Sequence, residues 1–597
     1  MRTHYPRTPH LPWSPGATSD DVRIADLSGL AGREVVVTEK LDGENTTLYA
    51  DGLHARSLDS AHHPSRGWVK ALQGRIGSRI PAGRRVCGEN MFARHSIPYD
   101  GLESWFYGFS VWDGERCLDW DRTVAFLRGL GIPVPPVLWR GVLDARAEKA
   151  LRALRPDTGR QEGYVVRPAD GFDAADFGRL VAKWVRPGHV RTDTHWMHAA
   201  VVENGLGPAA ALWAVRSGAP VDAAALAGAV GASAADAGGT DSGAGAGSGA
   251  GGAGGAGSGA GAGGPGGVGV GPGSRADAGA AAAMSDALDA LGRTGDDRLT
   301  GVLAALLHRG RRTELAPALA GTVGMPVARR VADLVGLHPS LHRPYPDEER
   351  RTGLARMSLA ADLEVLHALA AAVAGSHEER EQVEWSALHA QDVREPAGLD
   401  EAFADLEPTA ADRCRAQARE AYALGRISTV GEAVAATWRW RGGDFPCLIQ
   451  LVGPSGGGKS TFARGLPDVD AYVSLDDLRG ARGSRADQRA NGEVLREGLD
   501  RLDAALAAGG TVVWDATSLN AHQRSLVHAV ARRRDALVTH AVTVVDEAEL
   551  VRRNGRRAHP VPPEVLASQL RRYAPPYPGQ AHRTWYVGAG GTVEDRA

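Results

Sequence analysis

The stretch LIQLVGPSGGGKST, residues 448–461, joins an apolar run to a glycine-rich loop and to the start of a helical pattern. The loop has the spacing G-x-x-x-x-G-K-S, which runs from Gly453 through Gly458 to Lys459 and Ser460. Backbone N–H groups and a helix N-terminus at such a turn bind phosphate oxygens, the lysine reaches the outer phosphates, and the hydroxyl can ligate Mg²⁺. The stretch therefore predicts an α/β domain that binds ATP.

The segments after this loop continue the pattern of an α/β domain with a parallel sheet. They run through SLDDLR, a long helix, the strand TVVWDAT, another helix and the strand VTHAVTVV. Asp476 in SLDDLR is placed to accept a hydroxyl proton, and Arg479 is placed to grip a neighbouring phosphate. The segment VRRNGRRAHPVPPEVL supplies Arg553, Asn554 and Arg557, which suit a lid whose cations offset charge on a triphosphate. The pattern favours phosphoryl transfer to a hydroxyl group.

From about residue 445 to residue 597 the chain resembles the phage-type polynucleotide 5′-kinases. The resemblance implies that Asp476 is the general base, that Arg479 contacts the phosphate on the 3′ side of the acceptor, and that Arg557 contacts the donor phosphates. No phosphatase module of that family is visible in the sequence. Together, the phosphate loop and the resemblance imply that Ser460 ligates the metal. They also imply that the nucleotide is bound by Gly453, Gly458, Lys459, Ser460, Thr461 and Arg553.

A second motif, VVVTEKLDGENT at residues 35–46, places Lys40 in a K-x-D-G setting after an apolar strand. A lysine that attacks the α-phosphate of ATP must be neutral at that moment, so burial or nearby cations must lower its pKa. Such a site also needs carboxylates that hold a divalent metal and cations that neutralise the phosphates. K-x-D-G alone is a weak signal, and the segments downstream decide its meaning.

Those segments recur in the order that covalent nucleotidyltransferases use, and roughly the first 200 residues resemble the RNA ligase branch of that superfamily. The resemblance implies that Lys40 forms the covalent lysyl-AMP intermediate and that Glu162, in EGYVVR, holds the metal. The family usually has two lysines separated by one residue in its last motif, and here Arg186 is the candidate for the second cation. The resemblance further implies that Glu89, in VCGEN, contacts the ribose of the nucleotide and that Phe106 or Tyr107, in SWFYGFSVWD, stacks on the base. It also implies nucleotide contacts for Arg56, in ARSLDS, and phosphate contacts for Lys183, in VAKWVR.

The stretch after the last motif separates RNA ligases from their relatives. A DNA ligase core or a capping enzyme would continue into a β-rich OB barrel. Here THWMHAAVVENGLGPAAALWAV, residues 194–215, has a helical pattern, which favours the RNA ligase branch.

The sequence predicts a multidomain chain, because 597 residues correspond to about three or four domains. A run of Gly, Ala and Ser cannot bury a core and is expected to be a flexible linker; a fibrous repeat would need a strict period. The helical region after it holds His308, His338, His342 and His367, but no His-Asp dipeptide and no metal spacing, so we expect ordinary histidines. The predicted parts are an α+β nucleotidyltransferase domain with antiparallel sheets (1–200), a helical extension (201–230), the linker (231–274), a mostly α-helical accessory domain (275–430) and a P-loop kinase domain with a parallel sheet (431–597).

Composition sets the cellular context. Hydrophobic residues make up 43% of the chain and the net charge is -3, so binding of nucleic acid must rest on local basic clusters. The four cysteines are dispersed, which argues against a zinc site or disulfides and fits the reducing cytosol. No apolar leader and no membrane-spanning run are visible, so we expect a cytoplasmic protein.

Together the motifs predict a bifunctional enzyme of RNA repair, a polynucleotide 5′-hydroxyl kinase joined to an RNA ligase. ATP would serve both domains, with Mg²⁺ or Mn²⁺, and the partners would be RNA ends. A separate phosphatase would then heal the 3′ end. Two alternatives remain open at this stage. The first is a ligase fused to a nucleoside or small-molecule kinase, whose acceptor has no flanking phosphate for Arg479 to bind. The second is a non-catalytic sensor of RNA ends.

Overall fold

The computed structural model describes residues 2–58, 62–157, 159–188, 200–231, 275–393, 395–483, 491–557 and 559–597. The chain divides into two compact units, Met1–Ala229 with Ala281–Val302, and Val230–Ala280 with Leu303–Ala597. The predicted linker lies outside the described residues except for Gly231. The predicted helical accessory region does not form a unit by itself: its residues 281–302 group with the N-terminal part, and the rest groups with the P-loop part.

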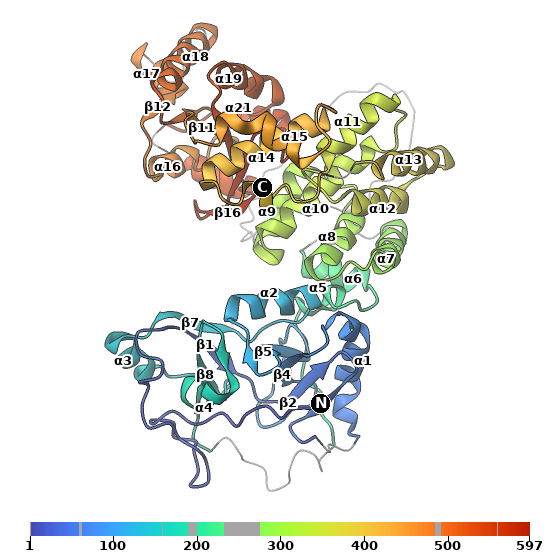
Figure 1. The fold of residues 1–597 in the computed structure, drawn as a ribbon, viewed down its shortest axis with the longest axis vertical. Helices are drawn as coiled ribbons and strands as arrows, with labels where there is room; N and C mark the ends of the chain where they lie inside the picture. The colour runs from blue at the N-terminus through green and yellow to red at the C-terminus, as the bar shows by residue number, and fades with distance from the viewer. Residues whose placement is uncertain are drawn as a thin grey trace, which may run out of the picture. The chain divides into compact units, whose positions relative to one another are not determined.

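The first unit is built on two antiparallel sheets, as the alternating strand patterns predict (Figure 1). One has the strand order β10-β8-β1-β7 and the other β3-β2-β4-β5-β6-β9. Their strands are β1 (Glu34–Lys40), β2 (Glu44–Tyr49), β3 (Gly52–Ala55), β4 (Arg84–Asn90), β5 (Phe106–Asp113), β6 (Arg116–Cys117), β7 (Val137–Val142), β8 (Gly163–Pro168), β9 (Phe172–Asp173) and β10 (Ala182–Val185).

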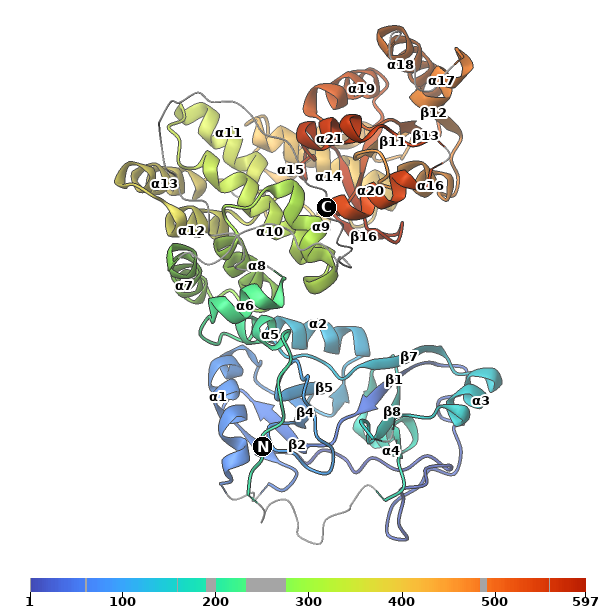
Figure 2. The same ribbon diagram turned by 180° about the vertical axis from the view of Figure 1, so that it is seen from behind.

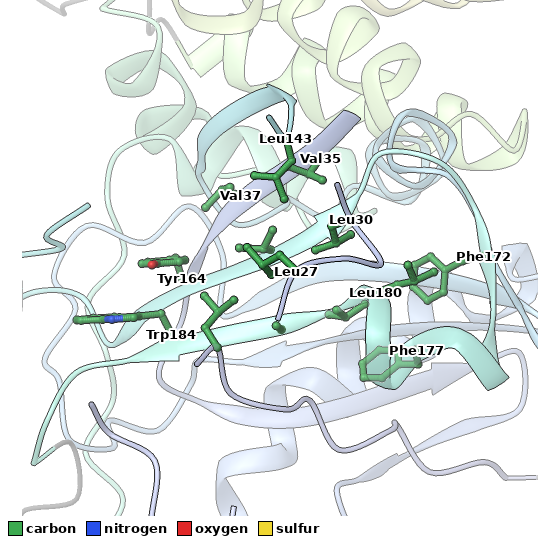
Figure 3. Packing of buried hydrophobic residues seen from close by; sticks show 14 of the residues in the cluster. Leu27, Leu30, Val35, Val37, Leu143, Tyr164, Phe172, Phe177, Leu180 and Trp184 are labelled. Carbon is green, nitrogen blue, oxygen red and sulfur yellow. The ribbon is translucent and has the colours of Figure 1, made fainter. Parts of the chain in front are cut away.

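Strand β1 is buried on both of its faces, since Val35, Val36 and Val37 have no exposed surface. Val35 and Val37 belong to a core cluster in which the rings of Tyr164 and Trp184 lie parallel, with centroids 5.5 Å apart (Figure 3). A continuous β-branched run of this kind is typical of a fully buried strand. The strand that carries the predicted nucleophile at its end is therefore held rigidly.

The helices of the first unit cover the outer face of the second sheet and extend the chain beyond it. Side chains of α1 and α2 form one core cluster with residues of β2, β4 and β5. The helices are α1 (Gly67–Ile76), α2 (Trp120–Leu130), α3 (Ala145–Ala153), α4 (Phe177–Leu180), α5 (Ala210–Arg216) and α6 (Ala223–Ala229), followed by α7 (Arg275–Ala290) and α8 (Gly295–Leu306), each of which crosses the boundary between the units.

The helical pattern predicted for residues 194–215 is correct only for its last part. Residues 194–199 lie outside the described residues, residues 200–208 are irregular, and α5 begins at Ala210. The irregular segment pairs with the loop after β4, where Asn204 donates from Nδ2 to the carbonyl oxygen of Met91 at 2.8 Å. Gly205 allows this approach, because a Cβ there would lie 2.9 Å from the Cα of Asp100. Tertiary pairing has overridden the local helical tendency.

The second unit has a six-stranded sheet in the order β12-β13-β11-β14-β15-β16, parallel except for its last pair, β15 and β16. The predicted parallel α/β fold is confirmed. Its strands are β11 (Cys447–Val452), β12 (Ala471–Ser474), β13 (Thr511–Asp515), β14 (Leu537–Thr543), β15 (Arg583–Val587) and β16 (Val593–Arg596). Its helices are α16 (Lys459–Arg464), α17 (Leu475–Ala481), α18 (Asn491–Ala508), α19 (Ala521–Arg533), α20 (Glu547–Gly555, labelled in Figure 2) and α21 (Pro563–Arg572).

The helical region confirms the expectation of a mostly α-helical stretch before this sheet. Its first helices pack against the sheet, since Met325 of α10 contacts Val452, Val542 and Tyr586 in one cluster. No helix among the described residues is long and apolar enough to cross a membrane. The helices are α9 (Arg312–Val323), α10 (Met325–Leu337), α11 (Asp347–Met357), α12 (Leu363–Val373), α13 (His377–Ala390), α14 (Pro408–Ala423) and α15 (Val430–Thr437).

Candidate active sites

The N-terminal site is centred on Lys40 at the end of β1. The strand pairing sets Lys40 opposite Gly163, so Glu162, which precedes β8, comes beside it. The ammonium of Lys40 donates to Oε2 of Glu162 at 2.5 Å. Burial acts to lower the pKa of Lys40, but the charges of Glu162, Glu89 and Asp42 outweigh it and hold the pKa above its usual value. The lysine is therefore protonated in this state, and Glu162 must release it before it can attack.

Glu89, the predicted ribose contact, lies in the same group of charges. Burial raises the pKa of its carboxyl to about 8; Lys40 opposes that shift, while Glu162 and Asp42 add to it. The glycine of K-x-D-G makes the approach possible, since a Cβ on Gly43 would lie 3.0 Å from Cγ of Glu89 and 2.6 Å from the carbonyl oxygen of Asn90. The spacing of this motif thus has a steric reason as well as a chemical one.

Two of the predicted phosphate-binding cations come from β10 and the residue that follows it, whereas Arg56 follows β3 of the other sheet. Burial lowers the pKa of Lys183, and the positive charges of Lys40 and Arg56 lower it further. Arg186 is buried, and its backbone N–H donates to the carbonyl oxygen of Glu162 at 3.0 Å. The fold therefore brings these cations to the pocket where Lys40 and Glu162 meet.

The two candidate aromatics of β5 point to opposite faces of the sheet, as consecutive strand residues must. Phe106 is fully buried in the cluster under α1 and α2. Tyr107 packs instead with Leu41 of the nucleophile motif, and its hydroxyl accepts a hydrogen bond from the backbone N–H of Glu103 at 2.7 Å. Of the two, only Tyr107 lies on the side of Lys40.

Sequence reasoning missed the loop that supports this motif. The carboxylate of Asp42 accepts hydrogen bonds from the backbone N–H groups of Ser96 and Ile97 at 2.9 and 3.0 Å. Its own backbone N–H donates to the hydroxyl of Tyr99, and the backbone N–H of Tyr99 donates to Asn204. No linear signal marks these residues, because their partners are far away in the sequence.

The C-terminal site is built on the loop between β11 and α16. Gly458 has a positive φ of 85°, and Gly456 one of 88°, which glycine adopts without strain. Lys459 is buried and donates to the carbonyl oxygen of Pro454 at 2.8 Å. Burial lowers the pKa of Lys459 to about 8, a shift that Arg557 increases and that Asp515 and Asp476 oppose. The predicted lysine, base and lid arginine thus lie within electrostatic range of one another.

The predicted base and acceptor contact are paired with each other here. Nη1 of Arg479 donates to Oδ1 of Asp476 at 2.5 Å, and the Asp476 side chain is 62% exposed. Both side chains belong to the short helix α17, which follows the carboxyl end of β12. Ligands of open α/β sheets bind at that edge, so the pair is open to an acceptor from solvent.

The predicted lid segment lies beside the glycine loop. Arg553 donates to the carbonyl oxygen of Ala589 at 2.8 Å, and a Cβ on Gly458 would lie 3.5 Å from its guanidinium. Asn554 closes the turn that follows, because its side chain both donates to and accepts from the backbone of Val561. Asn554 therefore shapes the lid, whereas Arg553 lies beside the loop itself.

Both sites offer oxygen ligands of the kind that suit Mg²⁺ or Mn²⁺. In the first, Glu162 is 4% exposed and presents a carboxylate. In the second, Asp515 is 9% exposed and shares Tyr472 as a hydrogen-bond partner with Ser460 at the start of α16. Among the described residues no group of three or more His, Cys, Asp or Glu side chains is arranged to hold a metal by itself. A divalent cation in either site would then share its shell with the nucleotide.

Comparison with known proteins identifies the two domains. Residues 33–185 match the family model for RNA ligase, and residues 448–576 match the family model described as AAA domain. The chain therefore carries an RNA ligase domain, followed by a P-loop domain of the AAA type. Comparison with the curated proteins gave no match.

Solved structures of the RNA ligase of Naegleria gruberi resemble the chain. The structure with PPi is 22% identical, with a TM-score of 0.21, over 27% of this chain and 51% of the ligase. A mutant of that ligase with ATP and Mn is 20% identical, with a TM-score of 0.21, over 28% of this chain and 56% of the ligase. The chain spans about half the length of these solved ligases.

Proposed function

We propose that this chain is a bifunctional enzyme of RNA repair, which phosphorylates 5′-hydroxyl ends and then seals them. The proposal rests on one observation: each domain has its own lysine beside a carboxylate, Lys40 with Glu162 and Lys459 with Asp515. A single nucleotide-binding function would not need two such sites. The RNA ligase and P-loop family matches support both halves.

In the sealing reaction Lys40 is the nucleophile. Its Nζ bonds to the α-phosphorus of ATP while pyrophosphate leaves, and the AMP then passes to the 5′-phosphate of the RNA. A 3′-hydroxyl attacks that phosphate, and AMP leaves. Splitting the joining into steps replaces one difficult displacement by easier ones. Glu89 and Tyr107 hold the adenosine, and Arg56, Lys183 and Arg186 neutralise the phosphates.

The first step requires that Lys40 lose its proton. Mg²⁺ or Mn²⁺, held by Glu162, would neutralise charge on the triphosphate. A Glu162 carboxylate that shared its charge with a cation would hold the Lys40 ammonium less strongly than it does through the present hydrogen bond at 2.5 Å. Weaker attraction to that anion would lower the pKa of Lys40, because burial would then be opposed less.

In the phosphorylation reaction Asp476 is the general base. It accepts the proton of the RNA 5′-hydroxyl as that oxygen bonds to the γ-phosphorus, and ADP leaves with the bridging oxygen. Lys459 and Arg557 stabilise the charge on the transferred group, and Gly453, Gly458, Ser460, Thr461 and Arg553 hold the nucleotide. Arg479 leaves Asp476 and binds the phosphate on the 3′ side of the acceptor.

The test uses the purified full-length chain, ATP, Mg²⁺ or Mn²⁺, and a single-stranded RNA with 5′-hydroxyl and 3′-hydroxyl ends. We expect a denaturing gel to show phosphorylated RNA first and then adenylylated and joined RNA. Lys40→Ala should abolish joining and leave phosphorylation within about two-fold. Lys459→Ala should abolish phosphorylation of 5′-hydroxyl RNA, and therefore its joining, while RNA that already carries a 5′-phosphate is still joined. Absence of phosphorylated RNA with the unaltered chain would overturn the kinase half.

A further inference from the structure

Tyr472 lies outside every sequence motif, yet its side chain lies inside the P-loop site. It belongs to β12, where the parallel pairing sets it opposite Val513 and sets Ser474 opposite Asp515. Residues two apart on neighbouring strands point to the same face of a sheet, so Tyr472 and Asp515 share the face that packs against α16. The phenol hydroxyl of Tyr472 donates a hydrogen bond to Oδ2 of Asp515.

The same phenol also interacts with the hydroxyl at the start of α16. Burial raises the pKa of Tyr472 above its usual value; the hydrogen bond to Asp515 and that residue's charge add to the rise, and a hydrogen bond with Ser460 opposes it. The phenol thus lies between the carboxylate of Asp515, to which it donates, and the hydroxyl of Ser460.

Asp515 has a competing partner on its other side. It is 9% exposed, and its charge acts on the buried ammonium of Lys459. Among the described residues the phenol of Tyr472 is the one hydrogen-bond donor to this carboxylate, so without it the carboxylate could turn toward that ammonium. A carboxylate that turned toward Lys459 would present less negative charge to a cation beside Ser460.

We propose that Tyr472 is a positioning residue for the divalent cation of the P-loop site: its hydroxyl fixes the Asp515 carboxylate next to Ser460, so that both oxygens face the cation that enters with the nucleotide. This inference rests on the proposed function only in that the P-loop domain binds a nucleotide with a cation. It does not depend on which hydroxyl group accepts the phosphate.

The experiment measures binding of fluorescently labelled ADP to the full-length chain while Mg²⁺ is titrated, and subtracts the signal of Lys459→Ala to isolate the P-loop site. Tyr472→Phe should raise the Mg²⁺ concentration for half-maximal binding about 10- to 100-fold, as losses of residues that orient metal ligands do. The affinity for ADP without Mg²⁺ should stay within about two-fold, because the hydrogen bonds of the phenol go to the side chains of Asp515 and Ser460 and not to the backbone N–H groups that bind the phosphates. An unchanged Mg²⁺ titration would overturn the proposal.

Tyr586→Phe is the matched control. This tyrosine is 3% exposed on β15 of the same sheet, and its hydroxyl has no hydrogen-bond partner among the described residues. Removal of that hydroxyl should leave the Mg²⁺ titration as it is in the unaltered chain. An equal shift in both variants would mean that any lost phenol disturbs the sheet, which would also overturn the proposal.

A second pair of variants keeps the test open if Tyr472→Phe folds poorly. Asp515→Asn retains a hydrogen-bond acceptor for the phenol but removes the charge, so it should weaken the response to Mg²⁺ by itself. Adding Tyr472→His to Asp515→Asn should weaken it no further, since the tyrosine acts through the carboxylate; additive losses would contradict that route. A chain that binds Mg²⁺ and ADP as described but phosphorylates no RNA would refute the proposed kinase and leave Tyr472 in its role.

Discussion

The carboxyl of Glu89 shows how one buried group can tie the stability of the ligase domain to pH. Its pKa is raised to about 8 in the folded chain by burial, from an ordinary value of 4.5. The folded chain therefore keeps a proton that the unfolded chain releases above about pH 4.5, so the stability gained from this group is complete at low pH and is lost as the pH rises through about 8. The effect falls within the window in which enzymes are usually assayed.

Glu89→Gln should remove this dependence. We expect the melting temperature of the variant to rise relative to that of the unaltered chain as the pH goes from 6 to 9, because glutamine has no proton to lose. Thermal unfolding of the two chains across that range measures the difference. Glu115→Gln, at an exposed carboxyl of the same unit, serves as the control. A difference that does not change with pH would rule out the raised pKa.

Arg479 decides between the two kinds of acceptor. A phosphate on the 3′ side of an RNA end would take over the guanidinium that now binds Asp476. Arg479→Ala should lower kcat/KM for 5′-hydroxyl RNA by about 10- to 100-fold, the worth of a hydrogen bond to a charged group, and should leave phosphorylation of a free nucleoside unchanged. Kinetics with both acceptors measure this. No loss with either acceptor would favour a small-molecule kinase.

The residues that could be predicted are those whose partners lie close in the chain or in a fixed motif order. Lys40, Glu162 and the phosphate loop carry linear patterns, and the structure brings each of them to a site. Tyr472 and Asn204 could not be predicted in the same way. Their hydrogen-bond partners are 43 and 105 residues away, and only the strand order and the loop pairing bring them together.

At the scale of elements, α9 and α10 are joined to the P-loop sheet by buried charges. Asp333 is 1% exposed and accepts from Arg312 at 2.7 Å and from Arg329 at 3.1 Å, while Arg329 also bonds to Asp595 of β16. Arg312 further donates to the carbonyl oxygen of Pro575. The sequence predicted helices here from their periodicity, but it could not predict that they pack on this sheet, because the contacts depend on single buried ions.

Asp333→Asn should therefore destabilise the second unit more than an ordinary surface change. Removing one partner of a buried ion pair costs about 3–5 kcal/mol, because the remaining guanidinium groups lose their counter-charge. We expect the loss of phosphorylating activity on heating to move to lower temperature, while joining of 5′-phosphate RNA is spared. Asp392→Asn, at an exposed aspartate of the helical region, is the control. Equal heat sensitivity of the two variants would show that the network contributes little.

At the scale of the whole molecule, the chain passes from the first compact unit to the second near the start of the Gly/Ala/Ser run, but it returns to the first unit within α7 and leaves it again within α8. Residues 281–302, which follow that run, belong to the first unit. Arg298 of α8 is 1% exposed and donates to the carbonyl oxygens of Val215 and Ala219, and Asp296 pairs with Arg216 at 2.7 Å. A composition-based division could not reveal this, since a Gly/Ala/Ser-rich composition indicates a candidate linker and not which elements pack together.

Cutting the chain within residues 232–274 should consequently leave one particle rather than two. We expect fragments 1–231 and 275–597, made together, to co-elute in size-exclusion chromatography, because α7 and α8 of the second fragment complete the first unit. Arg298→Ala should break the association, since it leaves buried backbone oxygens without their donor, at about 1–3 kcal/mol for each unsatisfied group. Arg311→Ala, at an arginine that is 63% exposed, should not. Separate elution of the two unsubstituted fragments would contradict this prediction, because it would mean that only the covalent connection, and not the packing of α8, holds the two domains together. Fragments that stay together would allow an RNA end to be phosphorylated and sealed by a chain that has been cut within residues 232–274.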